Sequence, residues 1–230
     1  NPINNYGVNI NVADYAMFSE VYKGEKGDLD LVYYVLKENL ERAKTHFKQV
    51  PKMMEAFEYW FGPYPFYEDS FKVVEVPYLG MEHQSAVTYG NNWSNWGGER
   101  SWTNKYYGIV DGLLFHETAH EWWGNSITAI DPAHMWIQEG FAVYSEALYI
   151  EHKLGYNVMI DFLLKKRQGI KNNLPIVGPI NENYWAFGDS YNKGAWVLHT
   201  LRNAINNDDL WFSTLKKFAV DNAKSHVSTE

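Results

Sequence analysis

The spacing of apolar residues predicts a strand near the start of the chain and then a long helix. Apolar and polar residues alternate in places within residues 1–22, including residues 6–12, which is the period of a strand. Residues 23–27 read as a turn, and Asp28 is placed to cap a helix. Apolar residues then recur at steps of three and four, the stripe of a core-facing helix. These are Leu29, Val32, Leu36, Leu40, Ala43, Phe47 and Val50.

Short strands are predicted after this helical region. Pro51 either interrupts the long helix or starts a second segment that ends at Gly62. Residues 71–76 read as a strand, residues 79–84 as the next strand, at the sheet edge that borders a cleft, and residues 87–89 follow. The sequence therefore predicts a sheet in this half of the chain.

The second half of the chain predicts helices. Their expected ranges are about 106–123, 132–153, 156–169, 192–206 and 208–222. Two stretches without periodicity, residues 90–105 and 171–190, read as loops; tryptophans in the first are expected to pack in the loop or rim a cleft. A β-containing lobe at about 1–105 followed by an all-helical lobe at about 106–230 is the α+β pattern, with the cleft at the junction.

Composition narrows the class of protein. The chain has 230 residues, of which 46% are hydrophobic and 21% charged, as in a globular protein. The formal net charge of −8 argues against nucleic acid or an anionic membrane as a partner. No apolar run approaches the eighteen or so residues that span a bilayer. The absence of cysteine excludes thiolate metal ligands, and no compartment follows from any of these features.

The stretch from His116 to His120 reads H-E-x-x-H. Residues four apart lie on the same face of a helix, so the two imidazoles can bind one metal ion. Glu117 then lies about a third of a turn away. This motif predicts that the two histidines are zinc ligands and that the glutamate acts as general base. The alternative is a chance pattern on an amphipathic helix.

A catalytic zinc usually has three protein ligands and one open position. Gly124 predicts the end of the first helix, and Asp131 followed by Pro132 predicts the start of another. That second helix carries Glu139, which eighteen residues separate from His120. Two helices joined by a short link can return this carboxylate to the histidine pair.

These motifs together resemble the M1 aminopeptidases, a gluzincin family with a thermolysin-like catalytic domain. Residues 116–120 and the Q-E-G-F-A of residues 138–142 carry the zinc-site pattern. Residues 80–82 (G-M-E) resemble the family's G-x-M-E-N, residues 120–125 (H-E-W-W-G-N) its H-Q-W-F-G-N, and residues 191–195 (Y-N-K-G-A) its Y-E-K-G-A. The resemblance covers nearly the whole chain.

The resemblance implies one zinc ion per chain, held by His116, His120 and Glu139. A zinc-bound water would give up its proton to Glu117, which then carries the proton to the leaving amine. Tyr191 would donate to the oxyanion; packing is the alternative role for this tyrosine. Residues 1–230 are expected to be a single catalytic domain excised from a larger protein, between a β-rich and a helical domain.

The expected function is a zinc aminopeptidase that acts on peptides with a free amino terminus. By resemblance, Glu82 pairs with the substrate ammonium, and Gly80 and Met81 form the adjoining backbone. His83 stands where the family has Asn, which places a titratable ring beside the amine site; a role as a further zinc ligand is disfavoured.

Two alternatives remain: an epoxide hydrolase of the leukotriene A4 hydrolase type, and an inactive peptide-binding module. Glu146 is interpreted either as a partner of a zinc-binding histidine or as a surface carboxylate. The other histidines are assigned structural roles: His46, His134, His152, His199 and His226.

Overall fold

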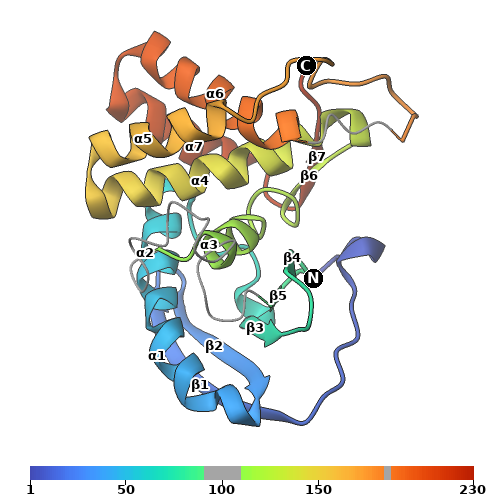
Figure 1. The fold of residues 1–230 in the computed structure, drawn as a ribbon, viewed down its shortest axis with the longest axis vertical. Coiled ribbons are helices and arrows are strands. Elements are labelled where there is room, and N and C mark those ends of the chain that lie inside the picture. The colour runs from blue at the N-terminus through green and yellow to red at the C-terminus, as the bar shows by residue number, and fades with distance from the viewer. Residues whose placement is uncertain (91–109, 184–187) are drawn as a thin grey trace. The chain divides into compact units, whose positions relative to one another are not determined.

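The computed structural model describes residues 1–90, 110–183 and 188–230, which form two compact units, Asn1–Glu121 and Trp122–Glu230 (Figure 1). The helix with the histidine pair belongs to the first unit, whereas the sequence placed it at the head of the helical lobe. The loop expected at residues 90–105 and the start of the helix expected at 106–123 lie almost entirely outside the described residues.

The first unit is built on the predicted sheet, which is mixed and has the strand order β1-β2-β3-β5-β4. The strands are β1 (Tyr15–Gly24), β2 (Gly27–Leu36), β3 (Phe71–Glu75), β4 (Gly80–Met81) and β5 (Ala86–Tyr89). β2, β3 and β5 run parallel, while β1 and β4 pair antiparallel at the two edges. The expectation of a strand at the sheet edge after β3 is confirmed, although β4 is shorter than predicted.

The helix predicted from Asp28 to Val50 is wrong over residues 28–36, because Gly27–Leu36 is β2, and helical structure begins only at residue 37. The buried residues of β2 alternate with more exposed ones, the period of a strand: Leu29, Leu31, Tyr33 and Val35 are all fully buried. A two-residue turn at residues 25–26, followed by Gly27 at φ 111°, returns the chain so that β2 pairs along the whole of β1. Pairing with β1 and burial of one face therefore prevail over the helical spacing.

The strand predicted within residues 1–22 is confirmed only at the end of that range, since β1 begins at Tyr15. Val8, Ile10 and Val12 are exposed and belong to no strand. An alternating pattern without a neighbouring strand does not form a sheet, because its backbone groups remain unpaired.

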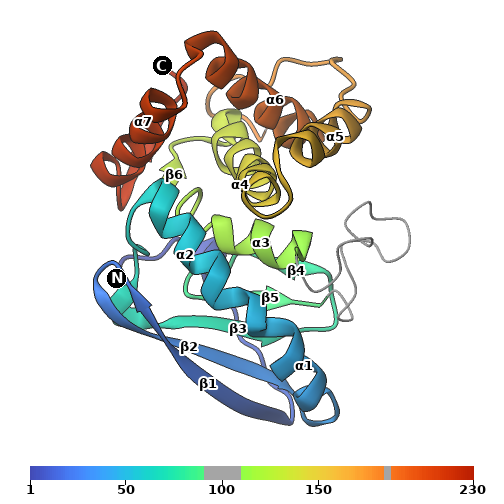
Figure 2. The same ribbon diagram turned by 90° about the vertical axis from the view of Figure 1, so that its left-hand side faces the viewer.

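Helices α1 (Leu40–His46), α2 (Val50–Phe61) and α3 (Gly112–Ala119) cover one face of this sheet (Figure 2). Pro51 stands in the first turn of α2, and Gly62 ends the helix at φ 86°, as the sequence indicated. Phe47 stacks on Tyr33 of β2 with ring centroids 5.1 Å apart. Aromatic and aliphatic packing thus fixes the helices on the buried side of the sheet.

The second unit contains α4 (Trp136–Leu154), α5 (Tyr156–Arg167), α6 (Gly188–Ile205) and α7 (Asp208–Asp221). α4 packs beside α5 and α6 (Figure 1). The helical predictions for this region are confirmed, but the unit is not all-helical. β6 (Ile127–Ala129) and β7 (Ser225–Val227) form a parallel pair, and strands of three residues are too short to show a period in the sequence.

Short 3-10 turns connect several elements: Asn5–Gly7, Lys37–Asn39, Phe47–Gln49, Tyr67–Asp69 and Pro132–His134. Asp131 caps the last of these, since its side chain accepts from the Ala133 N–H, and α4 begins one turn later than predicted. Among the helices of the described ranges, none combines the length and apolar character needed to cross a membrane.

Candidate metal and active site

Helix α3 presents the histidine pair. Its first turn is capped by Asp111, whose carboxylate accepts from the N–H groups of Leu113 and Leu114 at 3.1 and 3.2 Å. The Nε2 atoms of His116 and His120 lie 3.2 Å apart, and the rings are nearly perpendicular at 87°. Two nitrogens bound tetrahedrally to zinc at about 2.0–2.1 Å would lie about 3.3–3.4 Å apart. The pair therefore fits one zinc ion.

Two carboxylates accompany the histidines in the first unit. Ligand atoms of Glu82, Glu117 and His120 all lie within 4.8 Å of one another. Both carboxylates are more than nine-tenths buried. Two buried carboxylates this close repel each other, so a cation or an ammonium group between or beside them would be strongly favoured.

Gly80 lets the edge strand β4 approach α3. A Cβ at this position would lie 3.0 Å from the Thr88 carbonyl oxygen, 3.1 Å from Leu113 Cδ1 and 3.3 Å from Glu117 Oε1. The strand reaches this position by pairing with β5, with Met81 opposite Thr88. The missing side chain thus brings the segment that carries Glu82 against the helix that carries Glu117.

Glu121, to which the sequence pattern assigns no role, holds the turn after Glu82. The Ser85 N–H donates to Glu121 Oε1 and Oε2 at 2.9 and 3.1 Å, and the Tyr64 hydroxyl donates to Oε2 at 2.9 Å. Burial, and then the Glu121 charge, raise the pKa of Tyr64 well above its ordinary value. The sequence feature that could have revealed this role is the glutamate at position 121, because the family motif has Gln there.

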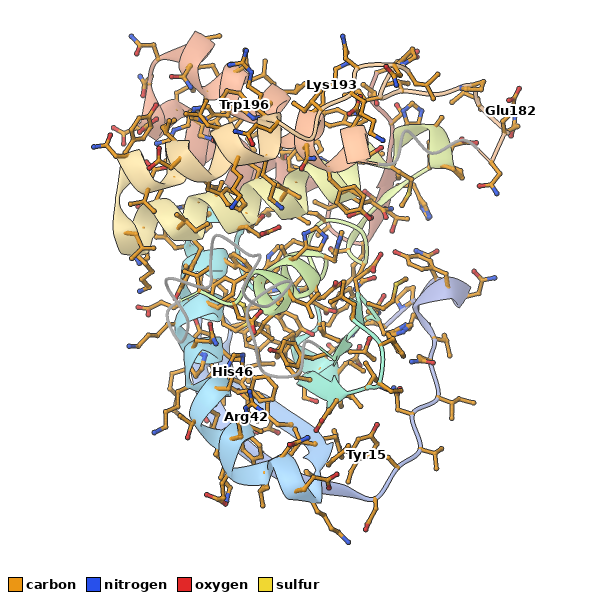
Figure 3. All side chains as sticks on the ribbon, viewed as in Figure 1. Tyr15, Arg42, His46, Glu182, Lys193 and Trp196 are labelled. Carbon is orange, nitrogen blue, oxygen red and sulfur yellow. The ribbon has the colours of Figure 1, made fainter. Side chains whose placement is uncertain are left out.

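A second buried network anchors the start of α3. His46 Nε2 lies 2.6 Å from Asp111 Oδ2, and the Tyr89 hydroxyl donates to the same oxygen at 2.5 Å. His46 is the last residue of α1 and is labelled in Figure 3. The carboxylate that caps α3 is therefore also tied to α1 and β5, which supports a structural role for His46.

His83 is buried beside Glu82 and hydrogen-bonds the backbone of Gly7. Burial lowers the pKa of the His83 imidazole. The next residue, Gln84, donates from Nε2 to the Pro2 carbonyl oxygen at 2.8 Å. The first residues of the chain thus lie against the turn that follows Glu82.

The second unit carries the two other predicted residues. Glu139 lies in the first turn of α4 and is 4% exposed, while Tyr191 lies in the first turn of α6 and is partly exposed. Glu146 is 2% exposed, and its Oε2 lies 4.0 Å from Lys166 Nζ. The alternative of Glu146 as a surface carboxylate is therefore wrong, while its interpretation as an outer partner of a ligand stays a prediction.

Comparison with known proteins identifies the family. Residues 45–230 match the family model described as the peptidase family M1 domain. The chain is 24% identical to mouse endoplasmic reticulum aminopeptidase 1 over 90% of this chain and 24% of that protein. It is 30% identical to rice aminopeptidase M1-A over 73% of this chain and 21% of that protein. The chain thus spans about a quarter of the length of these relatives.

The fold agrees with solved structures. An M1 zinc metallopeptidase from Deinococcus radiodurans matches with a TM-score of 0.76 at 21% identity, covering 94% of this chain and 46% of that one. A yeast LTA4 hydrolase in complex with bestatin matches with a TM-score of 0.70 at 19% identity, covering 86% and 33% of the two chains. The predicted α+β metallopeptidase fold is therefore confirmed, and the chain belongs to the peptidase M1 family.

Proposed function

We propose that this chain is the catalytic domain of a zinc-dependent aminopeptidase that hydrolyses the first peptide bond of peptides with a free amino terminus. The observation that carries the proposal is the cluster at the end of α3, where the Nε2 atoms of His116 and His120 lie 3.2 Å apart and ligand atoms of Glu117 and Glu82 lie within 4.8 Å of one of His120. Membership of the M1 family supports the same reaction.

His116, His120 and Glu139 are the proposed zinc ligands. A bound zinc ion would lower the pKa of a coordinated water and polarise the substrate carbonyl. Glu117 is the proposed general base, because it adjoins a ligand in sequence and is buried close to His120. It takes the proton of the attacking water and passes it to the departing amine.

Glu82 is the proposed site for the substrate ammonium, which would place the scissile bond one residue from the amino end. Its burial near Glu117 supports this role, because an ammonium group there would offset the repulsion of two buried carboxylates. The backbone of Gly80 and Met81 adjoins the same position. Tyr191 is the proposed oxyanion donor, and the flanking parts of the parent protein are proposed to complete the amine pocket.

The test compares one short peptide with a free and with an acetylated amino terminus, using the full-length parent protein with zinc content measured. Cleavage of only the free form, lost in Glu117→Gln with zinc retained, supports the proposal. Glu82→Gln serves as the matched variant and is expected to raise KM for the free peptide by tenfold or more. Equal cleavage of both forms contradicts the role of Glu82.

The same preparation tests the rival functions. Turnover of an epoxide lipid without cleavage of either peptide would favour the epoxide hydrolase alternative. Peptide binding without turnover of any substrate by zinc-loaded protein would favour a binding module.

A further inference from the structure

Helices α4 and α6 touch backbone to backbone at Gly140 and Gly194. A Cβ on Gly140 would lie 2.8 Å from the Cα of Gly194, and a Cβ on Gly194 would lie 2.8 Å from the Cα of Gly140. The carbonyl oxygens of Ser190 and Trp136, one turn earlier on each helix, lie 3.2 and 3.4 Å from the same positions. Ordinary contact begins at about 3.4 Å, so only glycine fits at either position without moving a helix.

The two glycines belong to the two segments of this unit to which catalytic roles are proposed. Gly140 directly follows Glu139, and Gly194 lies three residues after Tyr191. Residues three apart in a helix lie on neighbouring positions of one face. The backbone contact of the two helices is therefore within one turn of both the proposed ligand and the proposed oxyanion donor.

Other contacts of α6 hold it on either side of this crossing. The Asp189 carboxylate in its first turn accepts from the N–H groups of Lys171 and Asn172 at 2.8 and 2.7 Å. Trp196, labelled in Figure 3, donates from Nε1 to the Leu163 carbonyl oxygen of α5 at 2.8 Å. A side chain inserted at the crossing would displace α6 against these restraints, and the displacement would reach Tyr191.

We propose that the Gly140–Gly194 contact is a positioning device that sets the Tyr191 hydroxyl relative to Glu139. The inference rests on the proposed function. An added methyl at either glycine would push the two helices apart by about half an ångström. Catalytic groups must be held within about half an ångström of their productive positions, so this displacement is large enough to matter. A misplacement of about 1 Å can cost on the order of a hundredfold in rate. The glycines are positioning residues: they act through Tyr191 and are not themselves expected to touch substrate.

A double-mutant cycle in the full-length, zinc-loaded parent protein tests this inference with a peptide bearing a free amino terminus. The variants are Gly194→Ala, Tyr191→Phe and their combination, with Gly188→Ala as the control because its Cβ meets no atom of the described residues within 4 Å. Gly194→Ala is expected to lower kcat about tenfold or more and to change KM by less than about threefold. In the Tyr191→Phe background, the same substitution is expected to lower kcat by less than about twofold.

If the fold-loss of kcat in the double variant equals the product of the two single fold-losses, the inference is overturned, because the glycine then acts independently of Tyr191. If Gly194→Ala does not fold, the cycle is repeated with Gly140→Ala. Failure of both to fold would overturn the inference as well, since the contact would then serve the fold alone. Inactive wild-type protein with full zinc content would instead refute the proposed function, and the inference with it.

Discussion

The backbone N–H of Ser85 donates to both carboxylate oxygens of Glu121, at 2.9 and 3.1 Å. This pair joins the turn after Glu82 to the residue that follows His120. Ser85 adopts φ 60°, a left-handed conformation that the surrounding contacts must hold in place. The carboxylate thus connects the proposed amine site to the proposed metal site through one buried group.

Glu121→Ala is expected to lower the free energy of unfolding by about 3 kcal/mol. The substitution leaves the Ser85 N–H buried without its acceptor and removes the shortest contact of the Tyr64 hydroxyl, which also lies 3.2 Å from the Ser70 carbonyl oxygen. Glu121→Gln keeps one acceptor oxygen and is expected to lose about half as much. Urea unfolding measures both, with the exposed Glu68→Ala as control. Equal stability of Glu121→Ala and the control would contradict the assigned role.

Gly80→Ala is expected to lower kcat/KM about tenfold while zinc content is retained. The added methyl meets the Thr88 carbonyl oxygen at 3.0 Å and Glu117 Oε1 at 3.3 Å, so it displaces the proposed general base rather than the histidines. Overpacking at such a site also costs on the order of 1 kcal/mol of stability. Peptide turnover and metal analysis check the prediction; unchanged turnover would show that β4 gives way to the methyl without disturbing Glu117.

Asp111→Ala is expected to destabilise the protein by about 3–5 kcal/mol and to weaken zinc binding. The change removes the cap of α3 and the buried carboxylate shared by His46 and Tyr89, which keep their mutual contact at 3.0 Å between His46 Nε2 and the Tyr89 hydroxyl. Asn207→Ala is the matched control, since Asn207 caps α7 through the Leu210 N–H at an exposed site. That control is expected to lose about 1 kcal/mol. A similar loss in both variants would mean that the buried network contributes nothing beyond the cap.

His83→Asn, which restores the family residue, is expected to flatten the pH dependence of KM at pH values below 6.5. Burial lowers the pKa of His83 below its ordinary value of 6.5. The ring is therefore neutral at pH 7.5 and becomes charged only at pH values below 6.5. A positive imidazole beside Glu82 opposes the substrate ammonium, so KM of the wild type should rise at acidic pH. Steady-state kinetics with a free-amine peptide measure this, and parallel profiles of the two proteins would contradict it.

The sequence predicted those parts of the fold in which one period dominates. The helical stripes of α2, α4, α5, α6 and α7 appear in the structure at nearly the expected ranges. In β2, apolar residues satisfy two periods at once, because Leu29 and Val32 fit a helical step while Leu29, Leu31 and Tyr33 fit alternation. The choice between these periods depends on pairing with β1, which lies outside the segment itself.

The residues of the candidate site were also predictable only in part. His116, Glu117 and His120 were predictable because their spacing along one helix determines their geometry. The contacts of Glu121 with Ser85 and of Asp111 with His46 join residues 36 and 65 positions apart. Such pairs leave no period in the sequence. Only the folded sheet, with α1 and α3 on one face, brings them together (Figure 2).

The long hairpin of β1 and β2 has a consequence for the order of folding. Its ten paired positions close around a two-residue turn, so each contact joins residues that are near in the chain. Contacts of this kind form within microseconds, ahead of the parallel pairings of β2 with β3 and β3 with β5, whose loops are longer. We therefore expect the hairpin to form first and to present the side chains of Leu31 and Tyr33 as the surface on which α1 and α2 condense.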